Sequence, residues 1–294
     1  MLTASQASTR NRRPPASPKQ QYQQWLLDRI EDYKEQIPRE ELLQLGNEAA
    51  TELSDGADGQ QFLLTEVLMA DTVDRLIAKR LRLKSFSTWR KNFLPLRKAQ
   101  KEPNHWGIDT ANAVAVMIPR IEPGDSVLAV GSGAESAAYL LLAHEAVVHF
   151  IAGDLGCVER VQSRVIAEAL SSDFHAWVTL LGEYRLPTME QPADLVVIDV
   201  GAVAELSYAR RRALLHELQE VTRPGGVHVL VPGETGSNAP EGFLSHYPEW
   251  ERTPLPIPRK GGRVHGRGLL VTMPEAGWPT GWAEDEANRY GREA

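Results

Sequence analysis

The 294-residue chain has a single cysteine, Cys157, so it cannot form an internal disulfide. It contains no apolar run of the roughly 18 to 20 residues that a membrane-spanning helix needs. Its first residues are basic but lack the apolar stretch of a secretory signal. These absences lead us to expect a cytoplasmic protein with no membrane partner.

Metal ligands and a general excess of positive charge are also lacking. The eight histidines show no spacing with cysteines or carboxylates that is typical of a metal site. The net charge of −7 argues against a nucleic-acid binder that is basic all over, although a local basic patch is compatible with it. The remaining composition, 42% hydrophobic and 24% charged, is typical of a globular protein.

The N-terminal third has the period of helices and no alternating strands. Residues 1–18 are rich in Ser, Thr, Arg and Pro, and we expect a disordered tail there. Apolar residues recur at three- and four-residue spacing in three segments, 20–37, 39–53 and 60–83. We therefore predict an all-helical accessory region over residues 19–104.

Residues 75–101 hold ten basic residues and no acidic one, so the rest of the chain carries a net charge of −17. Phe86, Trp89 and Phe93 are interleaved with these charges. One interpretation is a surface for RNA or an acidic protein, with rings available for stacking. The other, which we favour, is a solvated basic helix that packs on the core domain through its aromatic residues.

From Ile108 onward, helical and strand-like segments alternate. We expect helices over 108–121, 156–170 and 202–221, and strands over 126–130, 147–152, 177–181, 195–200 and 227–231. Such nearly continuous apolar strands are typical of a parallel sheet covered on both faces.

Two further strand-like segments, 250–257 and 268–273, are separated only by the short loop around Lys260-Gly261-Gly262. No crossover helix fits there, so we expect these two strands to be antiparallel. The predicted fold is a Rossmann-like seven-stranded sheet, mostly parallel with an antiparallel last strand. It spans residues 105–274, and a tail follows at 275–294.

A glycine turn, Gly131-Ser132-Gly133, joins the strand at 126–130 to a helical segment. Glycines let the backbone approach a ligand closely, and a helix that begins there presents unpaired N–H groups to it. Asp154 follows the next strand, about 20 residues on, where a carboxylate accepts ribose hydroxyls. The pattern predicts an adenosine-containing cofactor but does not say which one.

Residues 105–273 resemble the class I S-adenosylmethionine-dependent methyltransferase family. The resemblance is carried by the strand pattern and by five stretches: VLAVGSG, GDLGCVERV, Leu181-Gly182-Glu183, ADLVVIDV and LLHELQEVTRPGGVHVLV. It implies S-adenosylmethionine as the cofactor. The candidate cofactor-binding residues are then Gly131, Gly133, Asp154, Leu155, Glu183, Tyr184 and Asp199. Of these, Asp154 would contact the ribose, and Glu183 and Tyr184 would lie near the adenine.

The chain departs from the family pattern at two positions. Ala129 stands where the family usually carries an acidic residue, and Glu135 stands where it often has a third glycine. Glu135 is a candidate contact for the methionine ammonium, or else it only stabilises a helix N-terminus. These departures leave a non-catalytic relative of the family open.

Asp199 and His105 are the candidate catalytic residues. Asp199 would line the active site, contact the methionine end of the cofactor, act as a general base or merely cap the next helix. His105 precedes the first core helix, where this fold often places a lid. A base or a stacking ring is one interpretation of His105, and a structural histidine is the other.

The predicted function is methyl transfer to an oxygen or nitrogen nucleophile of a small molecule or a protein side chain. The chain has neither the Asn/Asp-Pro-Pro-aromatic tetrapeptide nor the Pro-Cys pair that related enzymes use on nucleic-acid bases. The alternative is a non-catalytic protein that docks RNA or an acidic partner through residues 75–101. A nicotinamide-dependent oxidoreductase is disfavoured, and a homodimer is compatible with the sequence.

Overall fold

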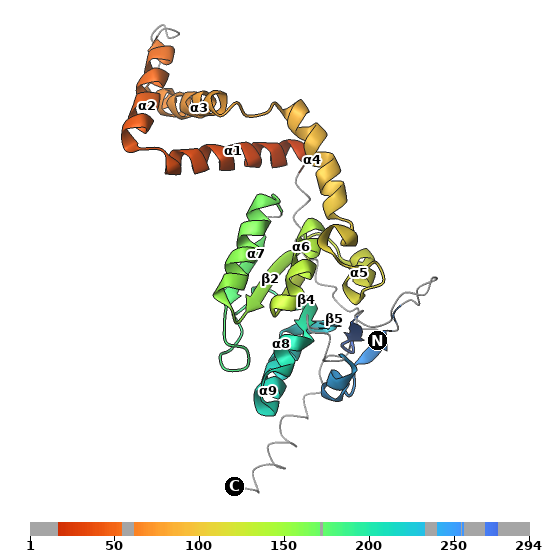
Figure 1. Ribbon diagram of the computed structural model, residues 1–294. Coiled ribbons are helices and arrows are strands. Elements are labelled where there is room, and N and C mark those ends of the chain that lie inside the picture. Colours follow the sequence, from red (N-terminus) through yellow and green to blue (C-terminus); the bar gives the residue numbers. More distant parts are fainter. Residues whose placement is uncertain are drawn as a thin grey trace, which may run out of the picture. The chain divides into compact units, whose positions relative to one another are not determined.

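The computed structural model describes residues 17–54, 62–170, 173–232, 240–253, 255 and 268–275. These residues fall into two compact units (Figure 1). The helical unit is Pro15–Leu96, and the sheet unit begins at Arg97. Residues 1–16 of the tail predicted at 1–18, residues 276–294 of the tail predicted at 275–294, and the loop around Lys260-Gly261-Gly262 lie outside the described residues. Pro18, predicted to be in the tail, begins the first helix.

The helical unit contains the three predicted helices and the beginning of a fourth. They are α1 (Pro18–Gln36), α2 (Arg39–Ser54), α3 (Phe62–Arg80) and α4 (Phe86–Gln100). The Ser17 hydroxyl and the Gln20 side chain form a reciprocal cap that starts α1. Ile30, Leu45 and Ile77, one from each of α1 to α3, are fully buried together.

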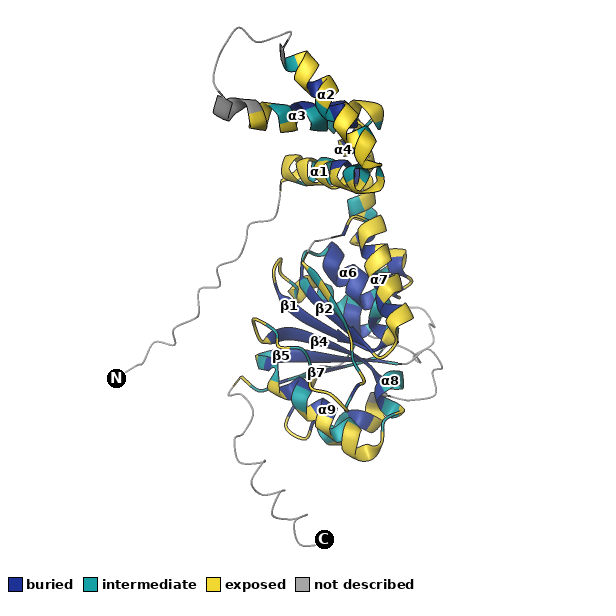
Figure 2. Ribbon diagram, turned by 90° about the vertical axis from the view of Figure 1, so that its left-hand side faces the viewer, coloured by how far each residue is buried: buried dark blue, intermediate teal, exposed yellow. Residues whose placement is uncertain are grey.

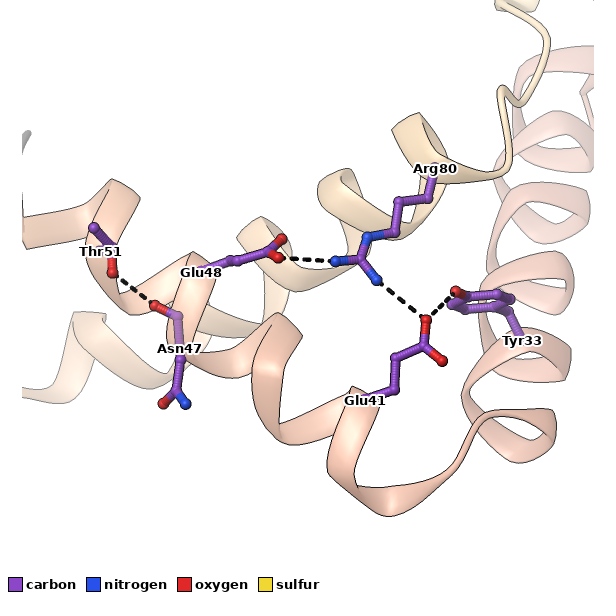
Figure 3. Close-up of polar contacts among 6 residues, drawn as sticks. All are labelled: Tyr33, Glu41, Asn47, Glu48, Thr51 and Arg80. Carbon is purple, nitrogen blue, oxygen red and sulfur yellow. Dashed lines mark hydrogen bonds and ion pairs between the residues drawn. The ribbon is translucent and has the colours of Figure 1, made fainter.

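Polar contacts join the same three helices (Figure 3). The Arg80 guanidinium donates to Glu41 at 3.2 Å and to Glu48 at 2.9 Å. The Tyr33 hydroxyl donates to the same Glu41 carboxylate at 3.1 Å. Arg80 is therefore held by α2, and its charge is balanced inside the helical unit.

The aromatic residues of α4 lie in a ring cluster within the helical unit. Trp89 is stacked on Phe93 with centroids 4.1 Å apart, and both side chains are buried. Tyr22 and Trp25 of α1 pack against Trp89. The rings are thus not free to stack on RNA bases, and they pack on α1 rather than on the core domain as we had expected.

The sheet unit is built on seven strands whose order is β3-β2-β1-β4-β5-β7-β6. Their bounds are β1 (Ser126–Val130), β2 (Val147–Ala152), β3 (Phe174–Val178), β4 (Ala193–Asp199), β5 (Thr222–Val231), β6 (Glu251–Thr253) and β7 (Leu269–Thr272). Strands β1 to β5 are mutually parallel, and β7 is antiparallel to both of its neighbours. The predicted fold class is confirmed, including the antiparallel pairing of the last two strands.

Helices cover both faces of this sheet, and Figure 2 shows the strands between them as buried. On one face lie α5 (Ala113–Met117), α6 (Glu135–Ala143) and α7 (Leu155–Ala167). On the other lie α8 (Val200–Ala204), α9 (Tyr208–Glu220) and η4 (Pro240–His246). Shorter 3-10 turns are η1 (Pro103–Trp106), η2 (Ile118–Arg120) and η3 (Ser132–Ala134).

Several predicted elements differ in extent from those in the structure. The helix expected at 108–121 is only α5 followed by η2, because the Asn112 side chain caps its start at Val114. The strand expected at 177–181 is β3, three residues earlier. Along β3 the side chains of Phe174 and Ala176 lie on one face of the sheet and that of Trp177 lies on the other. A half-exposed edge strand can accommodate such mixed residues on both faces.

The helix expected at 202–221 is divided into α8 and α9. Ser207 caps the start of α9, and the Arg211 side chain donates to the Val203, Ala204 and Leu206 carbonyls that end α8. The strand expected to begin at Val227 begins at Thr222 instead. Its pairing with β4 shifts register near Ala193, so the Arg-Pro-Gly-Gly sequence is absorbed as an irregularity of β5.

Within the described ranges, no helix combines the length and apolar character required to cross a bilayer.

Candidate cofactor site

The glycine turn after β1 is joined to the end of β4 by a carboxylate. The Gly133 N–H donates to Asp199 Oδ2 at 2.8 Å, and the Gly201 N–H donates to Asp199 Oδ1 at 2.9 Å. Asp199 is only 3% exposed. Both carboxylate oxygens therefore accept backbone hydrogen bonds, one from the turn and one from the start of α8, so Asp199 caps α8 and also holds the turn.

The two glycines are required by this contact. A Cβ atom on Gly133 would lie 2.8 Å from Asp199 Cγ, and one on Gly131 would lie 2.6 Å from Asp199 Cβ. Gly131 also has a φ of +91°, which L side chains rarely adopt. The sequence led us to expect a ligand close to the backbone of this turn. In the structure it is the Asp199 side chain that lies close to it.

Asp154 lies just beyond β2 and begins α7. Its Oδ2 accepts the Cys157 N–H at 2.8 Å, and the residue is exposed together with Gly153 and Leu155. Because β2 and β4 flank β1 and run parallel to it, Asp154, just after β2, and Asp199, the last residue of β4, lie at the same edge of the sheet. That edge of an open parallel sheet is where ligands bind in α/β folds.

Glu135, at the start of α6, already has protein partners for both oxygens. Oε1 accepts the Tyr139 hydroxyl at 2.7 Å, and Oε2 lies 3.1 Å from the Arg160 guanidinium. Burial and the neighbouring Glu135 carboxylate raise the pKa of Tyr139, so its hydroxyl stays a donor. In this structure Glu135 ties α6 to α7.

Glu183 and Tyr184 lie in the turn after β3, against α9. The Glu183 carboxylate is 2.7 Å from the Arg210 guanidinium, and Tyr184 is 64% exposed. A cavity of about 780 Å³ is lined by residues of this turn and of α9. The residues that line it do not include the glycine turn, Asp154 or Asp199, so this cavity is not the crevice at the strand ends.

His105 lies on η1 and is exposed. Its ring packs edge to face against the ring of Trp106. The Trp106 side chain is buried, donates its indole N–H to the Gln100 carbonyl and packs on Tyr139 of α6. No described contact joins His105 to Asp199. The structure therefore brings Gly131, Gly133, Asp154 and Asp199 to one edge and leaves His105 on the flank of α6.

Asp194 is a buried carboxylate that the sequence did not indicate as important. It is 7% exposed at the start of β4, accepts the Ser126 N–H at 2.8 Å and pairs with Arg223. It lies at the opposite edge from Asp199, so its role is to join β1, β4 and β5. No group of three or more potential metal ligands occurs in the part of the chain that the structure describes.

No protein-family model and no curated protein matches this chain. Similar solved structures include N-methyltransferase NodS from Bradyrhizobium japonicum, at 14% identity over 55% of this chain and 93% of that chain, with a TM-score of 0.44. A TehB-like SAM-dependent methyltransferase from Corynebacterium glutamicum has 15% identity over 63% and 95%, with a TM-score of 0.42. TehB from Haemophilus influenzae has 16% identity over 54% and 61%, with a TM-score of 0.41.

Proposed function

We propose that this chain is an S-adenosylmethionine-dependent methyltransferase acting on an oxygen or nitrogen nucleophile of a small molecule or a protein side chain. The observation that carries the proposal is the buried Asp199 carboxylate on the glycine turn. When bound, S-adenosylmethionine supplies a methyl group on a positively charged sulfur.

The position of Asp199 favours a cationic ligand over a phosphate. Dinucleotide-binding turns offer their N–H groups to a pyrophosphate. Here the Gly133 N–H is already donated to a carboxylate, and a phosphate at the same place would meet a buried negative charge. An ammonium or sulfonium group would instead be attracted, which supports S-adenosylmethionine over a nicotinamide cofactor.

Asp154 is suited to hold the ribose. Its exposed carboxylate has acceptor sites beyond the one that Cys157 N–H occupies, enough for two hydroxyl donors. Leu155, 56% exposed beside it, offers an apolar contact. For the adenine we assign Tyr184 ahead of Glu183, because the Glu183 carboxylate is already paired with Arg210.

We assign Asp199 a positioning role. Both of its oxygens accept N–H groups, so proton transfer would disrupt the bonds that hold the turn. Asp199 supplies the negative charge near the turn that an acidic residue at the position of Ala129 would supply. Glu135 is therefore not needed to attract the methionine ammonium. Proton removal from the acceptor falls to another group, and exposed His105 is the candidate to test.

The experiment is calorimetric titration with S-adenosylhomocysteine, followed by incubation with methyl-labelled S-adenosylmethionine and panels of small amines, alcohols and proteins. The proposal expects saturable binding and label transfer to an acceptor. Binding without transfer to any acceptor would favour the non-catalytic alternative. Absence of binding would contradict both interpretations of the sheet unit.

A second candidate function is docking of RNA or an acidic protein by α4. Arg90, Lys91 and Lys98 are exposed on this helix, whose sequence has no acidic residue. Because the rings of Trp89 and Phe93 are buried, the attraction would be to charge alone. Binding that weakens steeply with salt and is lost in Arg90→Ala/Lys91→Ala would support it, and unchanged binding in that variant would exclude it.

A further inference from the structure

The two edges of the described sheet differ in how they are protected. At one edge, β6 is three residues long and carries Glu251 and Arg252. At the other, β3 has the sequence FHAWV, without charge, proline or bulge. Charged or very short edge strands prevent further pairing, so β3 is the edge open to another strand.

Hydrogen bonds at both ends of β3 show which backbone groups point outward. The Val148 N–H donates to the Asp173 carbonyl at 2.9 Å, and the Thr179 N–H donates to the Ala152 carbonyl at 3.0 Å. Along a parallel strand, the backbone groups of every second residue hydrogen-bond to a given neighbouring strand. Residues 173, 175, 177 and 179 are therefore the ones that bond to β2. The N–H and C=O groups of Phe174, Ala176 and Val178 therefore point away from the sheet.

We propose that a second copy of this chain pairs with this edge, β3 antiparallel to β3, about a twofold axis at Ala176. In that register the three outward N–H groups of each copy meet carbonyls of the other. Ala176 faces Ala176 of the second copy, and Phe174 faces Val178 of the second copy. The sheet then continues across the axis.

The side chains in this register are self-complementary. His175 meets Trp177 of the second copy on the α9 side of the sheet, and these rings already lie in a parallel stack with His149. On the other side a half-exposed Val178 meets Phe174 of the second copy. Aromatic and β-branched cross-strand pairs of this kind stabilise antiparallel strands.

Helix α7 adds two exposed apolar side chains beside the same edge, with the exposed Glu159 between them on that side. Arg160 contacts Glu135 and Arg164 lies over the Tyr139 ring, so one side of α7 faces α6. Leu155 and Ile166 lie on the opposite side, three helical turns apart, and are 56% and 77% exposed. That side is directed past β3, where α7 of the second copy would approach.

Size and charge set the strength expected of this contact. The contact consists of the five residues of β3 and of Leu155 and Ile166. This is well under the roughly 20–30 residues per partner of a standard interface of about 800 Å², so the dimer is predicted to be weak and concentration-dependent. The paired strands bring no like charges together at the axis. Each chain otherwise carries −7, so salt should strengthen the association by screening the repulsion.

The test is sedimentation velocity of the full chain from low micromolar to several hundred micromolar concentration, at low and moderate salt. We expect a monomer–dimer equilibrium that Val178→Lys and Ile166→Glu each weaken by about tenfold or more, because each places a charge in the contact. Thr253→Lys, the same change at the β6 edge, is the matched control and should leave the equilibrium unchanged. A monomer at every concentration would overturn the proposal, as would equal weakening by Thr253→Lys.

Hydrogen exchange locates the contact independently of the variants. The amides of Phe174, Ala176 and Val178 should exchange more slowly as protein concentration rises, whereas those of His175 and Trp177, bonded to β2, should be slow throughout. A dimer whose formation leaves these three outward amides fast would place the interface elsewhere and overturn the proposal. Ala176→Pro removes one outward N–H without removing a bond to β2, and it should abolish the concentration dependence.

Discussion

The Gly133 N–H and the Asp199 carboxylate, 66 residues apart in the chain, are joined by a 2.8 Å hydrogen bond. The bond fixes the turn after β1 to the end of β4. It also places a buried acidic group beside the turn, whereas the residue on β1 itself, Ala129, is apolar and fully buried. The negative charge at this site therefore comes from the neighbouring strand.

Gly133→Ala is expected to destabilise the chain by about 1–3 kcal/mol, because the new methyl group would overlap Asp199 Cγ. Removal of that carboxylate makes room for the methyl group. In Gly133→Ala/Asp199→Ala the cost of the first change should therefore fall, with a coupling energy of about 1–2 kcal/mol. Denaturant unfolding of the two single variants and the double variant measures it.

Two other glycines are controls for this cycle. Gly131→Ala should not be rescued by Asp199→Ala, because its φ of +91° strains any L residue. Gly46→Ala, inside α2 with nothing within 4 Å of the new atom, should stabilise by about 0.5–1 kcal/mol. Strictly additive costs for Gly133 and Asp199 would show that the two residues do not act as a pair.

Asp154 is expected to have two separable roles, and two substitutions separate them. Asp154→Ala removes the cap of α7, which should cost about 1 kcal/mol of stability, and also removes the ribose acceptor. Asp154→Asn keeps a good cap, so stability should hold while affinity for S-adenosylmethionine falls about tenfold. Thermal unfolding and calorimetric titration check the pair. Full affinity in Asp154→Asn would mean that Asp154 only caps the helix.

His228 makes the sheet unit sensitive to acid. Burial lowers its pKa to about 3 from an ordinary 6.5, and its ring nitrogens lie 2.8 Å from the Thr222 hydroxyl and 3.0 Å from the Tyr247 hydroxyl. Below pH 6.5 the unfolded chain binds a proton that the folded chain does not, until the pH approaches 3. The free energy of unfolding should therefore decrease as the pH is lowered from 6.5 toward 3, by at most about 1.4 kcal/mol per pH unit for this group.

Urea unfolding between pH 7.5 and pH 5 measures that slope. Burial and the neighbouring His175 likewise lower the pKa of His149, to about 4, so both histidines act in the same direction. The Gln side chain in His228→Gln can still bond both hydroxyls but takes up no proton. This variant should therefore lose the part of the pH dependence of the unfolding free energy that His228 contributes. An unchanged slope in His228→Gln, or a stability that rises on acidification, would contradict this assignment.

The strands of the sheet unit were predictable where nearly every residue of the strand is buried. β1 and β2 were correct to the residue because both are buried along their length. β3 was misplaced because it is a half-exposed edge strand whose histidine and tryptophan alternate with apolar residues. The division between α8 and α9 depends on Arg211 reaching three carbonyls, and such a contact leaves no periodic signal.

The candidate site was predictable residue by residue but not as a set of contacts. The glycines and Asp154 follow local strand–turn–helix patterns, which a sequence displays. The sequence showed that Asp199 ends a strand, yet which strand adjoins β1 depends on the sheet order. The partners of Glu135 and Glu183, namely Arg160 and Arg210, are likewise tertiary contacts without a local signature.

The most direct test of this account is titration of the wild-type chain and Asp199→Asn with S-adenosylmethionine, with NAD as the control ligand. We predict micromolar binding of S-adenosylmethionine to the wild type, no binding of NAD, and a loss of affinity of at least about tenfold in Asp199→Asn. Glu251→Gln, which removes one exposed carboxylate on the edge strand β6, should bind like the wild type. Binding of NAD by the wild type, or undiminished S-adenosylmethionine affinity in Asp199→Asn, would contradict the claim that this carboxylate selects a cationic cofactor.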